Sequence, residues 1–351
     1  MEAIVKTGVP YTTRKKVNFI QCKQCPDIVF YIIDESINYE ALQSIGSTTL
    51  QENYVKEKLG NVPAFSYKAH SAGNHSSVSN YILRLALNKS SYPDSQYHTI
   101  TAPNIFSYAK AAGYKTIFYD AQSENNHLQN NMSQYDLDDI DQFITSDSVS
   151  KFFERDIIAL QRLKPFVDNA EPNNKVAITL VKRGLHFPYL YNVPDHLANK
   201  IPEECKVTDS SFLSNPIFCK KKQYEIGLQF SVDMFMEQLF KLLKGKNFAL
   251  IYTADHGQNL ASAYLPHGSS ENVSECEISV PVVIAGQAFA SISQSTGVRS
   301  HFQIPPTLLR IFGFPAQADM PDLWSSWQGN ADFLRSPFEK AWSTPVKNCV
   351  Y

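Results

Sequence analysis

Residues 27–36 read Asp-Ile-Val-Phe-Tyr-Ile-Ile-Asp-Glu-Ser, an unbroken apolar run that ends in two carboxylates and a hydroxyl. The run is continuous rather than alternating, which is typical of a strand buried on both faces of a parallel sheet. Similar runs recur along the chain and predict further strands. Together the predicted strands cover residues 27–33, 115–119, 175–181, 247–253 and 280–285.

Helical patterns lie between these runs. Residues 103–112 begin with Pro103 and stop before Gly113, the usual placement of proline near a helix start and glycine just past its end. Apolar residues recur at spacings of four and three through residues 228–242, and a further helix is expected after Pro305-Pro306. The alternation predicts an α/β fold, with a mostly parallel sheet sandwiched by helices.

The length and composition suit one large hydrophobic core, since the chain has 351 residues and is 43% hydrophobic. We predict an N-terminal extension over residues 1–26 and a single domain over residues 27–351. Two long polar stretches, residues 123–147 and 189–222, are expected to be insertions that form lids or surface loops.

Charge and hydropathy limit the partners. The 32 basic and 34 acidic residues leave a formal charge of −2. The chain therefore lacks the excess of basic residues that is typical of a nucleic-acid-binding domain. No uncharged apolar stretch reaches the about 18 residues of a membrane span, and residues 1–6 lack the apolar core of a secretory signal. Two interpretations stay open: a cytosolic protein, or a piece of a longer membrane-anchored one.

Six cysteines bear on the compartment. Their even number, and the polar, Pro-containing loop that holds Cys205 and Cys219, favour disulfides in an oxidising environment. Cys22 and Cys25 form a C-x-x-C that fits a zinc half-site, a redox pair or a short-loop disulfide. The pairing of Cys22, Cys25, Cys276 and Cys349 is not fixed by the sequence.

Polar side chains gather where the predicted strands end, which is where doubly wound sheets bind their ligands. Glu35 follows the first strand, His186 the third and Asp255-His256 the fourth, and His267 comes eleven residues after His256. Carboxylates and imidazoles from separate strands suit zinc with one position left open. We therefore predict Glu35, Asp255 and His256 as three protein ligands.

A hydroxyl nucleophile fits that open position. Residues 71–79 form a small, polar loop that leads into a helix-like run from Val78 to Leu87, and Ser76 lies in this loop. The free N–H groups at a helix start favour a phosphate. Zinc would lower the pKa of the hydroxyl and orient it for attack on phosphorus.

Each signal taken alone also has an ordinary structural explanation. Asp34-Glu35 fits a solvated turn, and Asp255 fits a helix cap. Ser76 alone is better explained as an N-cap, and His186 and His267 as hydrogen-bonded surface or pocket histidines. The functional interpretation depends on their combination and order.

Together these motifs resemble the catalytic domain of bacterial lipid and lipopolysaccharide phosphoethanolamine transferases, of the alkaline phosphatase/sulfatase superfamily. The matches run from about residue 27 to residue 312. Glu35-Ser36 resembles the family's glutamate-serine metal motif, and residues 73–79 resemble Gly-Thr-x-Thr-x-x-Ser with Ser76 at the nucleophile position. Further matches are residues 120–123 to Asp-Asn-Gln-Ser, residues 184–188 to Gly-Ser-His-Gly-Pro, residues 255–257 to Asp-His-Gly, and residues 267–268 to the downstream His-Gly.

The resemblance implies a set of site residues. It implies one zinc ion or two, with the ligands Glu35, Ser76, Asp255 and His256. His186 and His267 would bind the substrate phosphate or a second zinc, and one of them would protonate the leaving group. Asn74 and Gln122 are the further substrate-binding candidates, and Cys205 with Cys219 takes the place of a family disulfide.

The reaction so implied is a ping-pong transfer, in which Ser76 takes phosphoethanolamine from a phospholipid and a lipid or glycan hydroxyl then accepts it. We expect a monomer at the periplasmic face of the inner membrane, associated with it through a segment absent from this chain; a cytoplasmic location is the alternative. Ala121 and Asn74 depart from the family pattern, which puts the identity of the head group in doubt more than the metal site.

Three rival functions remain to be weighed. A sulfatase needs Cys or Ser in the motif C/S-x-P-x-R, and residues 76–80 contain neither the proline nor the arginine. A phosphodiesterase or phosphoglycerol transferase would use the same zinc and hydroxyl. A catalytically inactive binding domain would keep the fold but lose ligands, and the complete ligand set argues against it.

Overall fold

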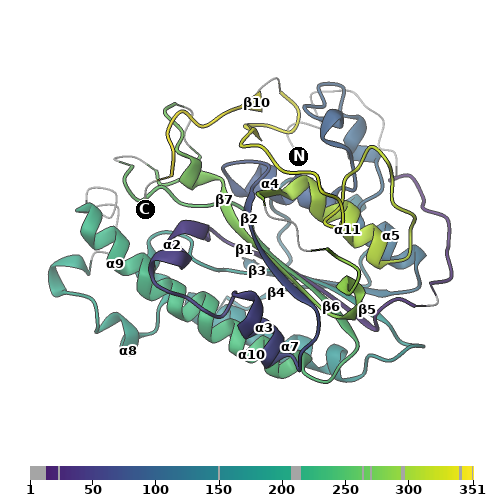
Figure 1. The fold of residues 1–351 in the computed structure, drawn as a ribbon, viewed down its shortest axis with the longest axis horizontal. Helices are drawn as coiled ribbons and strands as arrows, with labels where there is room; N and C mark the ends of the chain where they lie inside the picture. Colours follow the sequence, from purple (N-terminus) through teal and green to yellow (C-terminus); the bar gives the residue numbers. More distant parts are fainter. Residues whose placement is uncertain are drawn as a thin grey trace.

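The computed structural model describes residues 13–22, 24–148, 151–206, 215–262, 265–268, 271–293, 297–339, 342–349 and 351. Its centre is an eight-stranded sheet with the strand order β4-β3-β5-β1-β6-β7-β2-β8. Helices α3, α7 and α10 lie on one side of this sheet and α4, α5 and α11 on the other (Figure 1). The predicted α/β sandwich is confirmed.

The first predicted strand is the central one. β1 (Ile28–Asp34) is buried at every residue and pairs in parallel with β5 (Val176–Val181) and β6 (Phe248–Ala254). β3 (Lys115–Glu124) continues the parallel arrangement beyond β5, and β7 (Ser279–Ala285) pairs antiparallel with β6. All five predicted strands are therefore present.

Three strands of this sheet were not predicted, and all three lie toward its edges. β2 (Ala64–His70) pairs antiparallel with β7, and β8 (Arg299–Ser300) adds two residues beside β2. β4 (Gln142–Ser146) pairs with β3 at the opposite edge. The prediction of residues 123–147 as an insertion was thus wrong in part, because a polar edge strand lacks the apolar run of a central one.

The helices agree with prediction in place and differ at their ends. α5 (Ile105–Ala111) begins after Asn104, which caps it by a capping box, rather than at Pro103. α11 (Ile304–Ile311) contains the two prolines in its first turn. The helix predicted at residues 228–242 is the second part of a longer helical stretch formed by α9 (Ile217–Leu228), the π-helical turn η7 (Gln229–Met234) and α10 (Phe235–Leu243).

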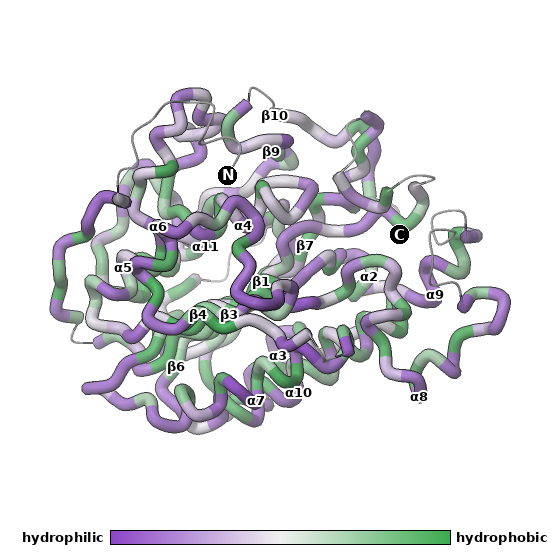
Figure 2. Tube along the Cα trace, turned by 180° about the vertical axis from the view of Figure 1, so that it is seen from behind, coloured by the Kyte–Doolittle hydropathy of each residue, from purple (hydrophilic) through white to green (hydrophobic). Residues whose placement is uncertain are grey.

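The remaining elements surround this framework. α7 (Arg155–Asp168) was not predicted, and α4 (Ser76–Arg84) is shorter than the predicted run to Leu87. The short elements include α2 (Tyr39–Ser44), α3 (Glu52–Lys58), α6 (Gln134–Leu137), α8 (Asp195–Ala198), η3 (Phe152–Glu154), η4 (Tyr189–Asn192), β9 (Phe333–Leu334) and β10 (Trp342–Ser343). The tube in Figure 2 is most hydrophobic through the interior strands and hydrophilic along the outer loops.

Part of the predicted N-terminal extension packs on the α5 side of the molecule. Arg14 forms an ion pair of 2.8 Å with Asp136, and the Lys15 N–H donates to the carbonyl of Thr101 at 2.8 Å. Residues 1–12 of the extension lie outside the described residues, as do residues 207–214 of the predicted 189–222 loop. The boundary at residue 26 stays a prediction.

All six cysteines are paired. Cys205–Cys219 is present as predicted, and Cys22–Cys25 and Cys276–Cys349 are the other two disulfides. The last one joins the segment before β7 to the end of the chain. Within the described ranges, no helix is both long and apolar enough to span a bilayer.

Candidate active site

Three predicted ligands meet at the carboxyl ends of β1 and β6. Glu35 follows β1, and Asp255 and His256 follow β6. These two strands are neighbours in register, with Asp34 opposite Ala254. As a result, one ligand atom from each of Glu35, Asp255 and His256 lies within 4.8 Å of the others, and all three residues are buried.

Ser76 brings its hydroxyl to the same point from another element. It is the first residue of α4, and its Oγ lies 3.1 Å from Glu35 Oε2 and 3.3 Å from His256 Nε2. The N-cap of α4 is His75, which makes no side-chain capping bond. The interpretation of Ser76 as an ordinary N-cap is therefore wrong, because its hydroxyl faces the buried ligands instead of the helix backbone.

The backbone around Asp255 leaves one of its oxygens without a hydrogen bond. Oδ1 accepts the N–H of Ser36 at 3.0 Å and the N–H of His256 at 2.8 Å. Ser36 holds its N–H there with a φ of 64°, in the left-handed region. Oδ2 is buried and has no hydrogen-bond partner among the described residues. A buried carboxylate oxygen in this position is suited to a cation.

In three histidines, the Nδ1 atom is hydrogen-bonded to an oxygen acceptor. Nδ1 of His256 lies 2.9 Å from the carbonyl of Gly257, and Nδ1 of His186 lies 2.7 Å from that of Phe187. Nδ1 of His267 lies 3.3 Å from Gln258 Oε1. Each oxygen requires an Nδ1–H donor, which leaves the lone pair on Nε2 for a metal or a proton.

Electrostatics favour a cation between these groups. Burial raises the pKa of Asp255 well above its usual value, and the neighbouring Glu35 raises it further. Burial lowers the pKa of His256, and it lowers the pKa of His267 to about 2 with help from the charge of His256. Neutral imidazoles beside two carboxylates form a nitrogen and oxygen donor set of the kind that zinc takes. The residues present therefore fit a zinc ion.

The two predicted phosphate-binding histidines lie beside this cluster. The ring of His267 lies 4.1 Å from that of His256 between centroids, and Phe187 lies 5.6 Å from His267. A proton on His186 or on His267 would lower the pKa of Glu35, so both rings lie within electrostatic range of this carboxylate. The Gly268 N–H donates to the carbonyl of Asn74 at 2.8 Å, which ties the His267 loop to the loop before Ser76.

Gln122 and Asn74 are both engaged by protein groups. Gln122 Nε2 donates to Glu35 Oε2 at 3.0 Å and to the carbonyl of Lys182 at 2.9 Å. Asn74 Nδ2 donates to Glu277 Oε2 at 3.0 Å, and both of these residues are buried. Their predicted substrate contacts stay predictions; in this structure the two amides support Glu35 and the nucleophile loop.

Sequence reasoning missed a buried lysine under the site. Lys182 Nζ lies 2.5 Å from Asp34 Oδ2, while Asp34 Oδ1 accepts the N–H of Glu35 at 2.9 Å. The available signal was a lysine directly after the apolar run 176–181, where a charge needs a partner. Gly184 is equally constrained, because a Cβ there would lie 2.4 Å from Asp34 Oδ1.

The fold and this site belong to a known class. The sequence profile of the family described as Sulfatase matches residues 27–314, most of the chain, and the chain belongs to this family. Within it, the predicted resemblance to the phosphoethanolamine transferases is confirmed. The chain is 24% identical over 239 residues to the Kdo(2)-lipid A phosphoethanolamine 7''-transferase of Salmonella typhimurium. The same enzyme of Escherichia coli matches over 251 residues, also at 24%.

These alignments include 62% and 63% of this chain, but only 40% and 41% of the two relatives. The chain therefore corresponds to less than half of each curated relative that it matches.

Solved structures of similar fold cover nearly the whole chain. The C-terminal periplasmic domain of EcEptC from Escherichia coli, in complex with Zn, has a TM-score of 0.68 at 17% identity and covers 95% of this chain and 96% of its own. The soluble domain of lipooligosaccharide phosphoethanolamine transferase A from Neisseria meningitidis has a TM-score of 0.64 at 14% identity, with 89% and 95% covered. At these identities the likeness establishes the fold.

Proposed function

We propose that this chain is the catalytic domain of a zinc-dependent phosphoethanolamine transferase, with Ser76 as nucleophile. The observation that carries the proposal is the position of the Ser76 hydroxyl, 3.1 Å from Glu35 and 3.3 Å from His256. The names of the relatives support the group transferred. Glu35, Ser76, Asp255 and His256 would hold the zinc, and a second ion would fall to His186 and His267.

In the first half of the reaction, Ser76 Oγ attacks the phosphorus of a phospholipid such as phosphatidylethanolamine. The Oγ–P bond forms, the bond from phosphorus to the diacylglycerol oxygen breaks, and the proton lost by Ser76 balances the one gained by diacylglycerol. When bound, zinc would lower the pKa of the hydroxyl and offset charge on the phosphoryl oxygens. The first turn of α4 presents its backbone N–H groups to the same phosphate.

The histidines supply the proton transfers. The Nε2 lone pairs of His186 and His267 can take up a proton. Burial lowers the pKa of His267, and a negative phosphate beside this ring would favour its protonated form. One of them then gives its proton to the leaving oxygen. In the second half, an acceptor hydroxyl attacks the phosphorus of phospho-Ser76, and Ser76 Oγ leaves and regains a proton.

The acceptor is proposed to be a lipid or glycan, as the named relatives act on Kdo(2)-lipid A. The similar EcEptC domain is a C-terminal periplasmic domain, and lipooligosaccharide phosphoethanolamine transferase A from Neisseria meningitidis is an integral membrane protein. We accordingly propose a monomeric domain at the periplasmic face of the inner membrane, attached through a segment outside this chain.

The nucleophile is tested by intact mass spectrometry after incubation with phosphatidylethanolamine. A phosphoethanolamine adduct is expected in the wild type and in Ser77→Ala, whose hydroxyl lies 2.9 Å from His75 Nδ1 rather than at the site. The adduct should be absent in Ser76→Ala, which should retain zinc. An adduct of equal yield in Ser76→Ala would refute the assignment. Release of phosphoethanolamine to water alone, with no transfer to a glycolipid, would instead favour a phosphodiesterase.

A further inference from the structure

Beside the candidate active site, the guanidinium group of Arg183 forms no ion pair with an acidic residue in the described part of the chain. Arg183 lies three residues before His186, and its Cζ lies 4.3 Å from the ring centroid of Phe152. Its Nε is buried without a hydrogen bond, and it forms no ion pair, as far as the described residues go. A buried or partly buried guanidinium is ordinarily paired with a carboxylate or phosphate.

The acidic neighbours of Arg183 are already engaged. Glu124 forms an ion pair with Arg155. Asp156 accepts the backbone N–H groups of Arg183 and Gly184 at 2.7 and 3.1 Å, and one of its oxygens lies 3.7 Å from Lys182 Nζ. The remaining acidic neighbour, Glu35, belongs to the metal site.

A second guanidinium lies against the same aromatic ring. Cζ of Arg155 is 4.7 Å from the centroid of Phe152. Burial lowers the pKa of Arg183, Glu35 raises it in part, and Arg155 lowers it again. Because a guanidinium stays protonated in proteins, two like charges lie against this one ring. An anion bound to Arg183 would relieve this repulsion.

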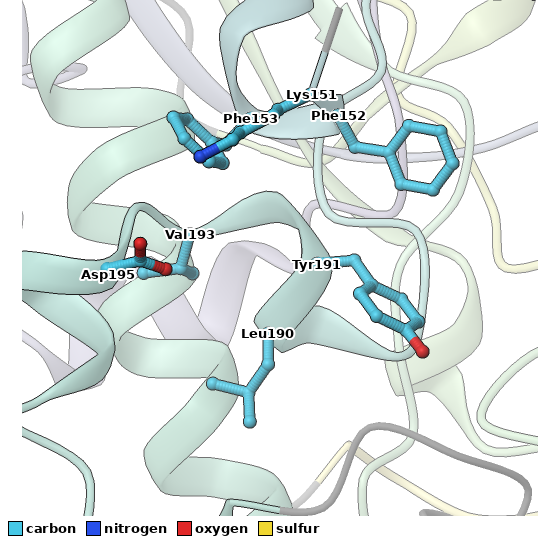
Figure 3. Close-up of a pocket in the computed structure, with 7 residues that line it drawn as sticks. All are labelled: Lys151, Phe152, Phe153, Leu190, Tyr191, Val193 and Asp195. Carbon is cyan, nitrogen blue, oxygen red and sulfur yellow. The ribbon is translucent and has the colours of Figure 1, made fainter.

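Phe152 also lines a pocket of about 460 Å³ between η3 and η4. Figure 3 shows Lys151, Phe152 and Phe153 on one side of it, with Leu190, Tyr191 and Val193 opposite and Asp195 at one end. The rings of Phe152 and Tyr191 meet edge to face at 6.3 Å, and both are partly exposed. The opposite wall is also joined to the active site, because Asn192 Nδ2 donates to the carbonyl of His186 at 2.5 Å.

We propose that this pocket is the acceptor subsite and holds a sugar ring whose anionic group, a carboxylate or a phosphate, pairs with Arg183. This inference rests on the transferase function proposed above. The volume lies within the about 300–1,000 Å³ of small-molecule sites. The planar fork of arginine matches either anion, and the exposed ring of Tyr191 offers a flat apolar face to a sugar.

The acyl chain of the donor fits this pocket less well. Lys151 and Asp195 line it, and burying their charges under a hydrocarbon chain would cost free energy without a compensating partner. The donor phosphate, in turn, is placed at Ser76 by the proposed reaction. An anionic acceptor satisfies both the charge of Arg183 and the mixed lining of the pocket.

The two half-reactions can be measured separately, which distinguishes an acceptor in this pocket from a donor in it. Phospho-Ser76 is formed with phosphatidylethanolamine, and its discharge is then followed with methyl glucuronide and with methyl glucoside as acceptors. In Arg183→Gln, we expect adduct formation to be unchanged and discharge by the glucuronide to fall about tenfold, to the rate with the glucoside. Arg162→Gln, a more exposed arginine of α7 that pairs with Asp147, is the matched control and should behave as wild type. A loss confined to adduct formation, or no loss at all, would overturn the proposal.

A binding measurement tests the subsite without requiring the enzyme to turn over. Saturation-transfer NMR of the same two glycosides should give about tenfold tighter binding of the glucuronide in the wild type, in Arg162→Gln and in Ser76→Ala. In Arg183→Gln the two glycosides should bind equally. Equal or undetectable binding of both glycosides by the wild type would overturn the subsite. The two proposals can fail separately. If no adduct forms on Ser76 but Arg183 still favours binding of the glucuronide over the glucoside, the proposed transferase function is refuted and the proposed sugar-binding subsite is retained.

Discussion

Lys182 Nζ lies 2.5 Å from Asp34 Oδ2, and neither side chain is exposed to solvent. Tyr252 donates its hydroxyl to the same oxygen at 2.8 Å. Lys182 also donates to the carbonyl of Ser231 at 2.6 Å, within the π-helical turn η7. Because Asp34 Oδ1 accepts the N–H of Glu35, this buried pair fixes the backbone of a proposed zinc ligand.

Replacing Lys182 by methionine leaves the Asp34 carboxylate buried without its cation. We expect Lys182→Met to lower the free energy of unfolding by about 3–5 kcal/mol, the usual cost of breaking a buried ion pair from one side. Urea unfolding followed by circular dichroism measures this difference.

The matched control is Lys164→Met, which removes an exposed lysine paired with Asp168 and should leave the free energy of unfolding almost unchanged, because solvent screens an exposed ion pair. Adding Asp34→Asn to Lys182→Met removes the unpaired charge and should recover part of the loss. A Lys182→Met protein as stable as Lys164→Met would show that the pair does not stabilise the fold.

The sequence predicted the centre of the fold and not its edges. A strand such as β1, buried on both faces, needs an unbroken apolar run, so its pattern is visible without any neighbour. β4 sits at the edge of the sheet and carries Gln142, Thr145 and Ser146, which is a polar pattern shared with loops. α7 was missed for a related reason, since Pro165 lies inside it and charged residues interrupt its apolar face.

The candidate site was predictable where it depends on strand ends. Glu35, Asp255 and His256 each follow an apolar run, and parallel strands carry such residues to one edge. The support of Glu35 by Gln122 and Lys182 was not predictable, because it arises from side chains that reach across neighbouring strands. Arg183 was given no role, because its contact with Phe152, thirty-one residues away in sequence, is visible only in the structure.

Removing His256 tests the metal site directly. We expect His256→Ala to weaken zinc binding by about a hundredfold or more, because it removes a ligand rather than an outer support, whose loss costs about 10–100-fold. Elemental analysis of the purified protein measures the zinc content. His98→Ala removes an exposed histidine whose ring bonds Gln96, two residues away, and this variant should keep its zinc. Equal zinc in both variants would place the ion elsewhere.

Gly257 tests how tightly the segment after His256 is packed. A Cβ at this position would lie 2.1 Å from the carbonyl oxygen of Cys276, whose side chain is held by the disulfide to Cys349. We expect Gly257→Ala to destabilise the protein by about 1–3 kcal/mol and to weaken zinc binding, because the backbone beside His256 must shift.

The control for this variant is Gly245→Ala. That site has a positive φ of 79° but nothing within 4 Å of the added carbon, so it reports backbone strain alone. Both variants are compared by urea unfolding and zinc content. Full zinc binding by Gly257→Ala would mean that the Cys276 segment yields without disturbing His256.

His301 makes the fold sensitive to acid. It is fully buried, and its Nδ1 accepts the N–H of Ala72 at 3.2 Å, so the folded protein needs the neutral ring. Burial lowers its pKa from 6.5 to about 3, and the charges of His256 and His70 oppose protonation further. Between these two pKa values the unfolded chain binds a proton that the folded chain does not. The free energy of unfolding therefore falls as pH is lowered through this window.

Replacing His301 by asparagine removes this titration while leaving an oxygen that can accept the Ala72 N–H. The full slope for one proton is about 1.4 kcal/mol per pH unit. We expect His301→Asn to lose less stability than the wild type between about pH 7 and about pH 5. Urea unfolding measures this difference, with a chelator in every sample so that no metal is bound. The contributions of His256 and His267 to the pH dependence are the same in both proteins and cancel in the comparison. His98→Asn, at an exposed site, should retain the wild-type slope. If His301→Asn also retains the wild-type slope, the imidazole of His301 is either already protonated in the folded protein or shielded from protonation in the unfolded chain.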